Sequence, residues 1–368
     1  MTRSEKKKRY DGMLIFVVLL LVAAGLVILY STSAYNGQVK FHDPFHYLKK
    51  QGFATLLGLF GMALIARVDY HKWVPLAIPA YVTSIILSVA VIFFGDEYNG
   101  SKRWLSLDPI SFQPSEFAKV AVIFFLACLV SRNVQRMKRF RTMILMMIPV
   151  LPIVGLVGAS NLSTAIIILG IAVVLIFVAD PKYVRFILMG SIGVGFMTVF
   201  LAMESYRLER LAIWRHPEQY EKGYQTLQGL YAIGSGGLFG RGLGNSVQKL
   251  GFLPEAQNDM IFSIICEELG LIGAGFIILL FLILIWRFFV ISTKASDLLG
   301  ALIAAGAMAH MMIQVILNIA VVTNSIPNTG ITLPFISYGG TSVVFLLLEM
   351  GLVLSVSNYE GLRYGGSE

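Results

Sequence analysis

The 368-residue sequence predicts an all-α, multi-pass membrane protein with about ten transmembrane helices. Only 14% of its residues are charged and 57% are hydrophobic, whereas in soluble domains about a quarter of the residues are charged. The apolar residues also fall into runs long enough to cross the hydrocarbon core of a bilayer as helices. Together these observations exclude an ordinary soluble protein and a disordered chain.

The expected spans follow one another along the chain with short polar connections. They are residues 13–31, 51–66, 74–94, 114–131, 142–158, 163–179, 185–203, 261–288, 298–320 and 341–357. The first span follows a basic segment, residues 1–12, and no small-residue cleavage site of the A-x-A kind comes after it. We therefore expect an uncleaved first span rather than a signal peptide, and one membrane domain over residues 1–368.

The distribution of Lys and Arg predicts the orientation of the chain. The run SRNVQRMKRFR at 131–141 indicates a cytoplasmic loop, and most other basic residues of the short loops fall on the same side. An even number of spans then places both termini, residues 1–12 and 358–368, in the cytoplasm. The formal net charge of +8 is accounted for by this basic inner face, so we expect contact with membrane lipid and no nucleic-acid partner.

One extracytoplasmic loop, residues 204–260, is long. Its first part mixes apolar and charged residues as an interfacial helix does, and Pro217 is expected to end that helix. A glycine-rich stretch at 229–246 is expected to form turns and close backbone approaches. No Walker-type or dinucleotide-binding motif occurs, which argues against ATP-driven transport by this chain alone.

Polar residues in or beside the spans are costly, and they concentrate in five places. Lys102 and Arg103 follow the third span. Glu116 and Lys119 share a face of the fourth span, where they form either a structural ion pair or part of a polar cavity. A break at 161–164 predicts a turn in which Ser163 or Thr164 caps the next helix, or a polar wall of the same cavity.

The other places lie later in the chain. Asp259 precedes the eighth span, and either helix capping or catalysis accounts for it. His310, Gln314 and Asn318 recur every four residues, which predicts hydrogen bonds between helices, with a proton relay as the alternative. The segment 324–342 combines prolines, glycines and hydroxyls, as in non-helical backbone that is buried in protein or lines a cavity.

Most of these residues fall on the outer side, where one cavity could collect them. Basic side chains, glycine-rich backbone and a carboxylate suit an anionic ligand that carries sugar or phosphate. The candidate ligand-binding residues are Lys102, Arg103, Glu116, Lys119, Arg241, Asn245, Ser246 and Glu255. The candidate cavity-lining residues are Asn161, Ser163, Thr164, Asn328, Thr329, Ser337, Tyr338, Gly339 and Gly340.

Several motifs in the expected order resemble the SEDS family (shape, elongation, division and sporulation). They are KRW at 102–104, QPSEFAK at 113–119, NLST at 161–164, AIGSGGLFGRGLGNS at 232–246, LPEAQND at 253–259, EELG at 267–270 and PNTGITLPFISYGGTS at 327–342. The GNSVQKLGFLPEA segment is most similar to the FtsW/SpoVE branch. At Ser160–Asn161 the sequence departs from the Gln-Pro-Asp-Leu-Gly-Thr run typical of RodA-like members.

The resemblance implies a peptidoglycan glycosyltransferase that polymerises lipid II and works with a class B penicillin-binding protein and other divisome proteins. It implies a location in the bacterial cell membrane, at the division septum, and a role in division or sporulation. It also implies that Asp259 is essential and that Glu116, Lys119 and Arg103 are functional.

On this basis Asp259 is the candidate general base of an inverting transfer, and Arg103 is the candidate contact for the leaving pyrophosphate. A divalent cation, Mg²⁺ or Mn²⁺, could serve the same purpose with Asp259 as a ligand, although no ligand cluster requires one. Two alternatives remain open: a lipid II transporter, and a non-catalytic activator of the penicillin-binding protein.

Overall fold

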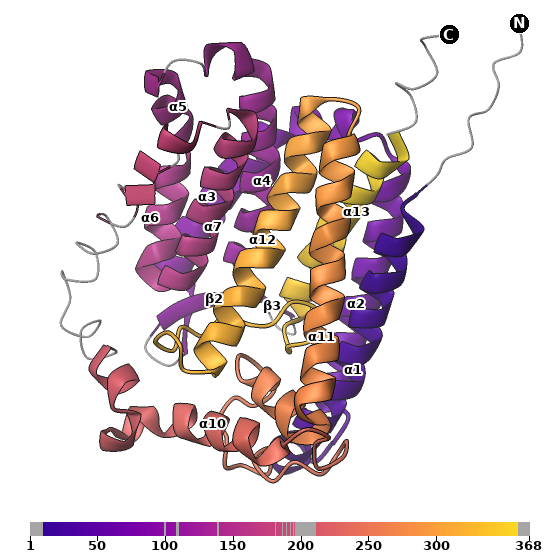
Figure 1. The fold of residues 1–368 in the computed structure, drawn as a ribbon, viewed down its shortest axis with the longest axis vertical. Helices are drawn as coiled ribbons and strands as arrows, with labels where there is room; N and C mark the ends of the chain where they lie inside the picture. Colours follow the sequence, from indigo (N-terminus) through magenta and orange to yellow (C-terminus); the bar gives the residue numbers. More distant parts are fainter. Residues whose placement is uncertain are drawn as a thin grey trace, which may run out of the picture.

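The computed structural model describes residues 10–98, 101–107, 110–137, 140–180, 182–185, 187, 188, 190, 191, 193, 195 and 211–359. These residues form a bundle of upright helices, with one small sheet and one transverse helix near the lower end (Figure 1). The chain enters α1 (Gly12–Phe41) and leaves α13 (Gly340–Tyr359) at the upper end, where the Asp11 amide donates to Ser357 Oγ at 3.3 Å. Both ends therefore lie on one side of the bundle, as an even number of spans requires. That this side is cytoplasmic stays a prediction.

Helices make up most of the described chain, and short strands interrupt them only before residue 114. The first half contains α1, α2 (His46–Arg67), η1 (Tyr70–Leu76), α3 (Ala77–Phe94), β1 (Asp96–Tyr98), β2 (Ser101–Leu107), β3 (Ile110–Phe112), α4 (Pro114–Asn133), η2 (Val134–Arg136), α5 (Phe140–Met147), α6 (Val150–Ser160) and α7 (Leu162–Ala179). The second half contains η3 (Pro217–Gln219), η4 (Glu221–Gly223), α10 (Tyr224–Gly236), α11 (Ile261–Lys294), α12 (Leu298–Val322) and α13.

Seven helices within the described residues are long and apolar enough to cross a membrane, and the bent pair α5–α6 makes an eighth. That pair corresponds to the predicted span 142–158 and bends by 42°, next to Pro149, which cannot donate a helical hydrogen bond. Of the remaining predicted spans, 51–66 corresponds to α2, and 185–203 lies largely outside the described residues. The prediction of an all-helical, multi-pass membrane protein is confirmed.

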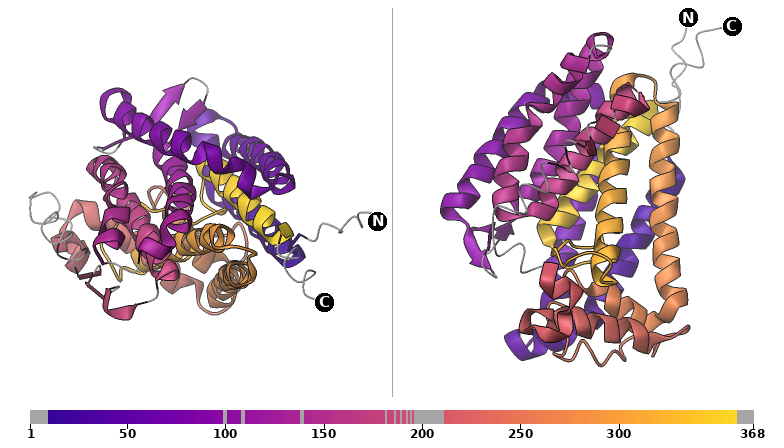
Figure 2. Two further views of the ribbon diagram at one scale, coloured as in Figure 1. Left: turned by 90° about the horizontal axis from the view of Figure 1, so that it is seen from above. Right: turned by 60° about the vertical axis from the view of Figure 1, so that its left-hand side comes forward.

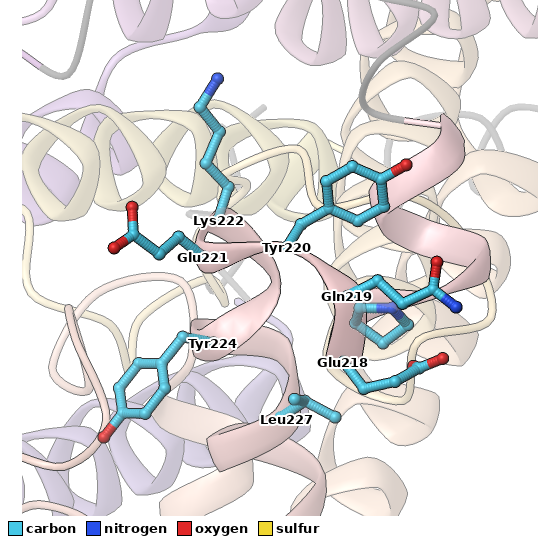
Figure 3. A pocket seen from close by; sticks show the side chains of 8 residues that line it. Glu218, Gln219, Tyr220, Glu221, Lys222, Tyr224 and Leu227 are labelled. Atoms are coloured by element: carbon cyan, nitrogen blue, oxygen red, sulfur yellow. The ribbon is translucent and has the colours of Figure 1, made fainter.

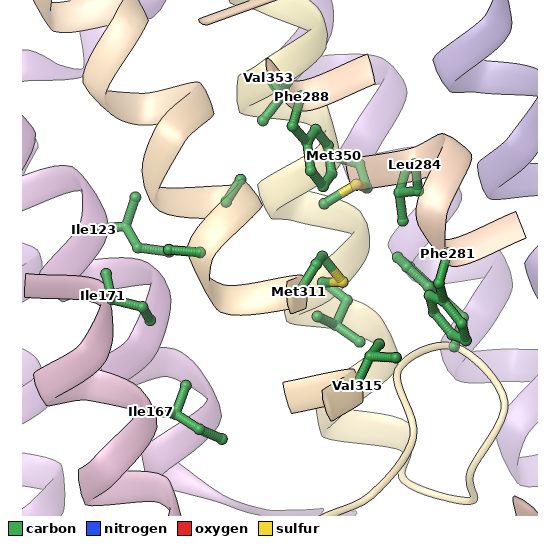
Figure 4. Packing of buried hydrophobic residues seen from close by; sticks show 14 of the residues in the cluster. Ile123, Ile167, Ile171, Phe281, Leu284, Phe288, Met311, Val315, Met350 and Val353 are labelled. Atoms are coloured by element: carbon green, nitrogen blue, oxygen red, sulfur yellow. The ribbon is translucent and has the colours of Figure 1, made fainter. Parts of the chain in front are cut away.

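The core of the bundle is built around α12, which packs against α4, α7, α11 and α13. Figure 4 shows side chains of α11, α12 and α13 meeting on one side of this core and those of α4 and α7 on the other. Gly306 permits a close approach, since a Cβ there would lie 2.6 Å from Cγ2 of Ile123 on α4. The polar residues of α12, His310, Gln314 and Asn318, are therefore enclosed by protein.

The helix α11 is broken at Gly270, whose φ of 67° and ψ of −170° are not helical. A break leaves carbonyls before it and amides after it without helical partners. The glycine-rich loop supplies them: the amides of Arg241 and Gly242 donate to the carbonyls of Glu267 and Glu268, both at 2.9 Å. The amide of Leu271 in turn donates to Gly237 O at 2.9 Å.

Two local features differ from the sequence-based expectation. The first part of the glycine-rich stretch is helical, because α10 continues to Gly236 and lies across the lower end of the bundle (Figure 2). In addition, β1, β2 and β3 form an antiparallel sheet between α3 and α4, where a loop was expected. The Asn99–Gly100 dipeptide between the first two strands is a strong hairpin signal and could have predicted the sheet.

Candidate functional site

The candidate site lies where β2, the loop before α11 and the segment after α12 meet, at the lower end of the bundle in Figure 1. Its centre is Gly330, whose φ is +70°. A Cβ built on Gly330 would lie 3.4 Å from Nη1 of Arg103 and 3.9 Å from Oδ2 of Asp259. A positively charged guanidinium and a carboxylate from distant parts of the sequence therefore flank the same piece of backbone.

Asp259 is buried, with 8% of its surface exposed. Burial raises the pKa of its carboxyl group from the ordinary value to about 7, and the negative charge of Glu255 adds to this rise. The positive charge of Arg103 opposes it. Helix capping does not account for Asp259, since the N-cap of α11 is Met260 and no side chain caps that helix. A carboxyl group with a pKa near neutrality suits proton transfer.

The loop that carries Asp259 is fixed by three successive backbone carbonyls. The carbonyl of Gln257 accepts from the Tyr338 amide at 2.9 Å, and that of Asn258 accepts from Ser337 Oγ at 2.7 Å. The carbonyl of Asp259 accepts from Nδ2 of Asn318 at 2.9 Å. Two of the predicted cavity residues, Ser337 and Tyr338, therefore support the loop, and their role in lining a cavity stays a prediction.

Gly339 and Gly340 lie next to this support. The amide of Gly339 donates to Oε1 of Gln51 at 3.1 Å, and Nε2 of Gln51 donates to the carbonyl of Ser337 at 3.3 Å. Gly340 begins α13 and faces α2, where a Cβ would lie 3.3 Å from Cβ of Ala54. This turn therefore joins α13 to α2 beside the site.

Hydrogen bonds also hold the segment around Gly330. Ser163 Oγ donates to the carbonyl of Thr329 at 3.3 Å, and Oδ1 of Asn328 accepts from the Gly330 amide at 3.1 Å. Asn328 also donates to Gln225 of α10 at 3.0 Å. Within the described residues, the buried Oγ1 of Thr329 has no hydrogen-bond partner.

Arg103 projects from β2 toward the junction of α6 and α7, where its Nε donates to the carbonyl of Ser160 at 3.2 Å. The α7 helix starts there, and its cap is Asn161, whose Oδ1 accepts from the Thr164 amide at 3.2 Å. The expectation that Ser163 or Thr164 caps this helix is therefore wrong. Lys102 is the adjacent residue in β2, and its Cα pairs with that of Glu97 in β1.

Glu116 and Lys119 form a buried ion pair on α4 with Nζ and Oε1 2.8 Å apart. Only 6% of Glu116 and 1% of Lys119 is exposed, so the contacts favour the structural ion pair over an open polar cavity. Lys119 also donates to Oε1 of Gln314 on α12 at 2.9 Å. The pair is thus connected to the helix that supports Asp259.

Three other predicted ligand-binding residues belong to a second cluster, around the broken part of α11. Nη1 of Arg241 lies 3.4 Å from Oε1 of Glu267, and the hydroxyl of Ser246 donates to the same carboxylate. Asn245 donates to the carbonyl of Arg241 at 3.2 Å. In the same cluster, the carboxylate of Glu268 pairs with Lys249 at 2.6 Å. These contacts stabilise the loop, and a role of the three residues in binding a ligand stays a prediction.

The described residues contain no group of three His, Cys, Asp or Glu side chains that could hold a metal ion. Glu255 and Asp259 supply two carboxylates, and Mg²⁺ usually takes one or two carboxylates from protein, with water and substrate phosphates as its other ligands. The site therefore does not fit a resident cation held by protein alone. A surface hollow over η3 and η4, lined by residues such as Tyr220, Lys222 and Tyr224, contains none of the predicted site residues (Figure 3).

Comparison with known proteins identifies the class to which this fold and site belong. Residues 11–361 match the family model FTSW_RODA_SPOVE, described as cell cycle protein. The chain therefore belongs to the FtsW/RodA/SpoVE family, and the predicted membership is confirmed.

Individual relatives align over almost their whole length. The chain is 40% identical over 360 residues to Stage V sporulation protein E of Bacillus subtilis, covering 96% of this chain and 98% of the relative. It is 35% identical over 354 residues to the probable peptidoglycan glycosyltransferase FtsW of Geobacter sp. (strain M18), covering 95% of this chain and 96% of the relative.

Two solved structures share the fold. A chain from a structure described as the structural coordination of polymerization and crosslinking by a peptidoglycan synthase complex superposes with a TM-score of 0.79 at 28% identity, covering 96% of this chain and 99% of that one. Thermus thermophilus rod shape determining protein RodA superposes with a TM-score of 0.70 at 29% identity, covering 95% of this chain and 96% of that one.

Proposed function

We propose that this protein is a peptidoglycan glycosyltransferase that polymerises lipid II into glycan strands. The observation that carries the proposal is the buried Asp259 carboxyl group, with a pKa raised to about 7, beside Arg103 at the Gly330 backbone. The relatives named as probable peptidoglycan glycosyltransferases support the reaction class. The buried acid and the adjacent cation match the two needs of glycosyl transfer from a pyrophosphate: a base for the acceptor and a positive charge for the leaving group.

In this reaction the 4-hydroxyl of the acceptor GlcNAc attacks the anomeric carbon of the donor MurNAc. The new glycosidic C–O bond forms as the bond between that carbon and the polyprenyl pyrophosphate breaks, and the configuration inverts. The Asp259 carboxylate accepts the proton of the attacking hydroxyl, for which general-base catalysis typically contributes about 10²- to 10⁴-fold in rate. One base suffices, as in inverting glycosidases, where a single carboxylate activates the nucleophile.

Arg103 stabilises the charge that develops on the departing pyrophosphate. Its guanidinium presents two nitrogens in one plane and can hold two phosphate oxygens at once. Nε already donates to Ser160 O at 3.2 Å, which orients the group.

The proposal extends to the setting of the enzyme. The partner is a class B penicillin-binding protein that cross-links the strands, an assignment supported by the related chain from a peptidoglycan synthase complex. The chain acts as a single membrane domain, with residues 204–260 outside the cytoplasm, at the septum during division or sporulation. The likeness to Stage V sporulation protein E and to FtsW supports this cellular role.

Reconstituted protein and labelled lipid II distinguish this function from its alternatives. Liposomes containing the wild-type chain, with and without the partner, are assayed both for glycan polymer and for lipid II exposed on the opposite leaflet. We expect polymer with the wild-type chain and no polymer with a chain inactivated by Asp259→Asn. Lipid movement without polymer would identify a transporter, and polymer that persists with an inactivated chain would identify an activator.

A further inference from the structure

The polar face of α12 contains three buried side chains at four-residue spacing, His310, Gln314 and Asn318, each at most 1% exposed. Asn318 is nearest to the candidate site. Its Nδ2 donates both to the carbonyl of Asp259 at 2.9 Å and to the carbonyl of Ile331 at 2.7 Å. One amide group therefore joins the loop that carries the candidate base to the segment that contains Gly330.

Gln314, one turn away, holds the next residue of the same segment. Its Nε2 donates to the carbonyl of Thr332 at 3.1 Å, and its Oε1 accepts from Nζ of Lys119 at 2.9 Å. A carbonyl can only accept and an ammonium group can only donate, so the orientation of the Gln314 amide is determined. Residues 331 and 332 are thus held by successive turns of α12.

The same orientation determines where His310 carries a proton. Its Nε2 lies 2.9 Å from Oε1 of Gln314, which is an acceptor, so Nε2 must be protonated. Its Nδ1 lies 2.8 Å from Oε2 of Glu349 on α13. Two acceptors at that distance would repel each other, so a proton lies between them, on the imidazole or on the carboxyl group.

The charges of the surrounding groups lead to the same conclusion. Among the residues that the structure describes, the titratable groups of this buried network are Glu116 and Lys119 from α4, Glu349 from α13 and His310 itself. Two carboxylates and one ammonium would leave one net negative charge inside the bundle, at a high energetic cost. One additional proton on the His310–Glu349 pair makes the network neutral.

We propose that Asn318 and Gln314 are positioning residues that hold the Asp259 loop and the Gly330 segment together, and that one proton shared by His310 and Glu349 lets Nε2 of His310 donate to Gln314, a further hydrogen bond that holds this amide in place. The positioning role rests on the proposed glycosyltransferase function, because it acts through Asp259. The bound proton and the backbone connection are properties of the fold, so their tests need no activity.

The bound proton is tested by nitrogen NMR on protein labelled with ¹⁵N-histidine. The sequence contains five histidines, so the signals lost in a His310→Gln variant identify this side chain. We expect a protonated Nε2 at neutral pH in the wild type and in Glu349→Gln, whose amide can donate to Nδ1 in place of the proton. An unprotonated Nε2 in the wild type would overturn the assignment of the proton.

The backbone connection is tested by hydrogen–deuterium exchange in Asn318→Ala. We expect faster exchange in peptides that cover residues 329–333 and 257–260. The matched control is Asn133→Ala, which removes an amide that donates to a carbonyl of its own helix, Leu129 O at 2.8 Å, and which should leave these peptides unchanged. Unchanged exchange in Asn318→Ala would refute the connection.

Kinetics then test the positioning role. Asn318→Ala should lower kcat by about ten-fold or more, because a displaced base loses its alignment. It should also move the acid limb of the pH–rate profile to lower pH, as Asp259 becomes more hydrated and its pKa falls toward the ordinary value. Loss of folded protein would reduce the amplitude without moving this limb. An unmoved limb with normal kcat would overturn the role even though the wild type polymerises lipid II.

Discussion

Replacement of Arg103 by Gln removes a positive charge beside the candidate base while keeping a similar length of side chain. Nη1 of Arg103 and Oδ2 of Asp259 lie 3.4 and 3.9 Å from the position that a Cβ on Gly330 would take. The two atoms are therefore at most about 7 Å apart. At a separation of about 7 Å, two unit charges interact by about 2 kcal/mol at an effective dielectric constant near 20, which corresponds to a shift between one and two pKa units.

The sign of the shift follows from the charge. Arg103 stabilises the ionised form of Asp259, so its removal raises the pKa of that carboxyl group above its present value of about 7. Because the ionised form is the active base, the acid limb of the pH–rate profile should move to higher pH by about one to two units. The lost phosphate contact should also lower the maximal rate.

The assay is the pH dependence of kcat/KM for lipid II polymerisation. The matched control is Lys102→Gln, which removes the same charge from the adjacent residue of β2, where Lys102 pairs with Glu97 of β1. The control profile should keep its acid limb. An unmoved limb in Arg103→Gln, or an equal movement in Lys102→Gln, would refute the coupling of Arg103 to the base.

Three further changes have defined outcomes. Glu255→Gln removes the negative charge that raises the pKa of the base, so the acid limb of the same profile should move to lower pH; movement to higher pH would contradict the assigned sign. Gly270→Ala should lower the free energy of unfolding in detergent by about 1–3 kcal/mol or more. The reason is that the φ of Gly270 is +67° and the new Cβ would lie 2.3 Å from the Gly240 amide nitrogen. Gly275→Ala is the control and should cause no such loss, because the space around Gly275 is open. Lys119→Met leaves the buried Glu116 carboxylate unpaired and should lower the free energy of unfolding by about 3–5 kcal/mol. Adding Glu116→Gln to this variant should recover part of the loss. If the losses of the two single variants add up in the double variant, the ion pair is refuted.

Much of the architecture could be predicted from the sequence because apolar runs of membrane-spanning length have few other uses. The ends of the helices were harder to place. The first span was expected to end at residue 31, yet α1 continues to Phe41. Its polar residues at and beyond the end of the predicted span find partners in distant segments, since Ser31 donates to Glu268 at 2.8 Å and Asn36 donates to Gln257 at 3.0 Å. Such partners come from tertiary contacts and cannot be derived from local composition.

Only part of the site can be predicted from the sequence, because its residues are brought together by tertiary contacts. Arg103 and Asp259 stand out as costly polar residues, but nothing in their spacing shows that Gly330 lies between them. Glu349 is absent from the candidate residues, although a single carboxylate in the apolar run 341–357 is a recognisable signal of a buried partner. Its partner, His310, lies on another helix and becomes evident only when α12 and α13 are packed.

The turnover of a purified Asp259→Asn variant tests whether the Asp259 carboxylate is the base of a lipid II polymerase. The isosteric amide keeps the shape of the buried side chain but cannot accept the proton. We expect this variant to remain folded in the membrane, with an unfolding temperature at least equal to that of the wild type, since the amide avoids the cost of a buried carboxylate. Polymerisation should fall by at least about 10²-fold. Wild-type polymerisation by folded Asp259→Asn would refute the role of Asp259 as the base.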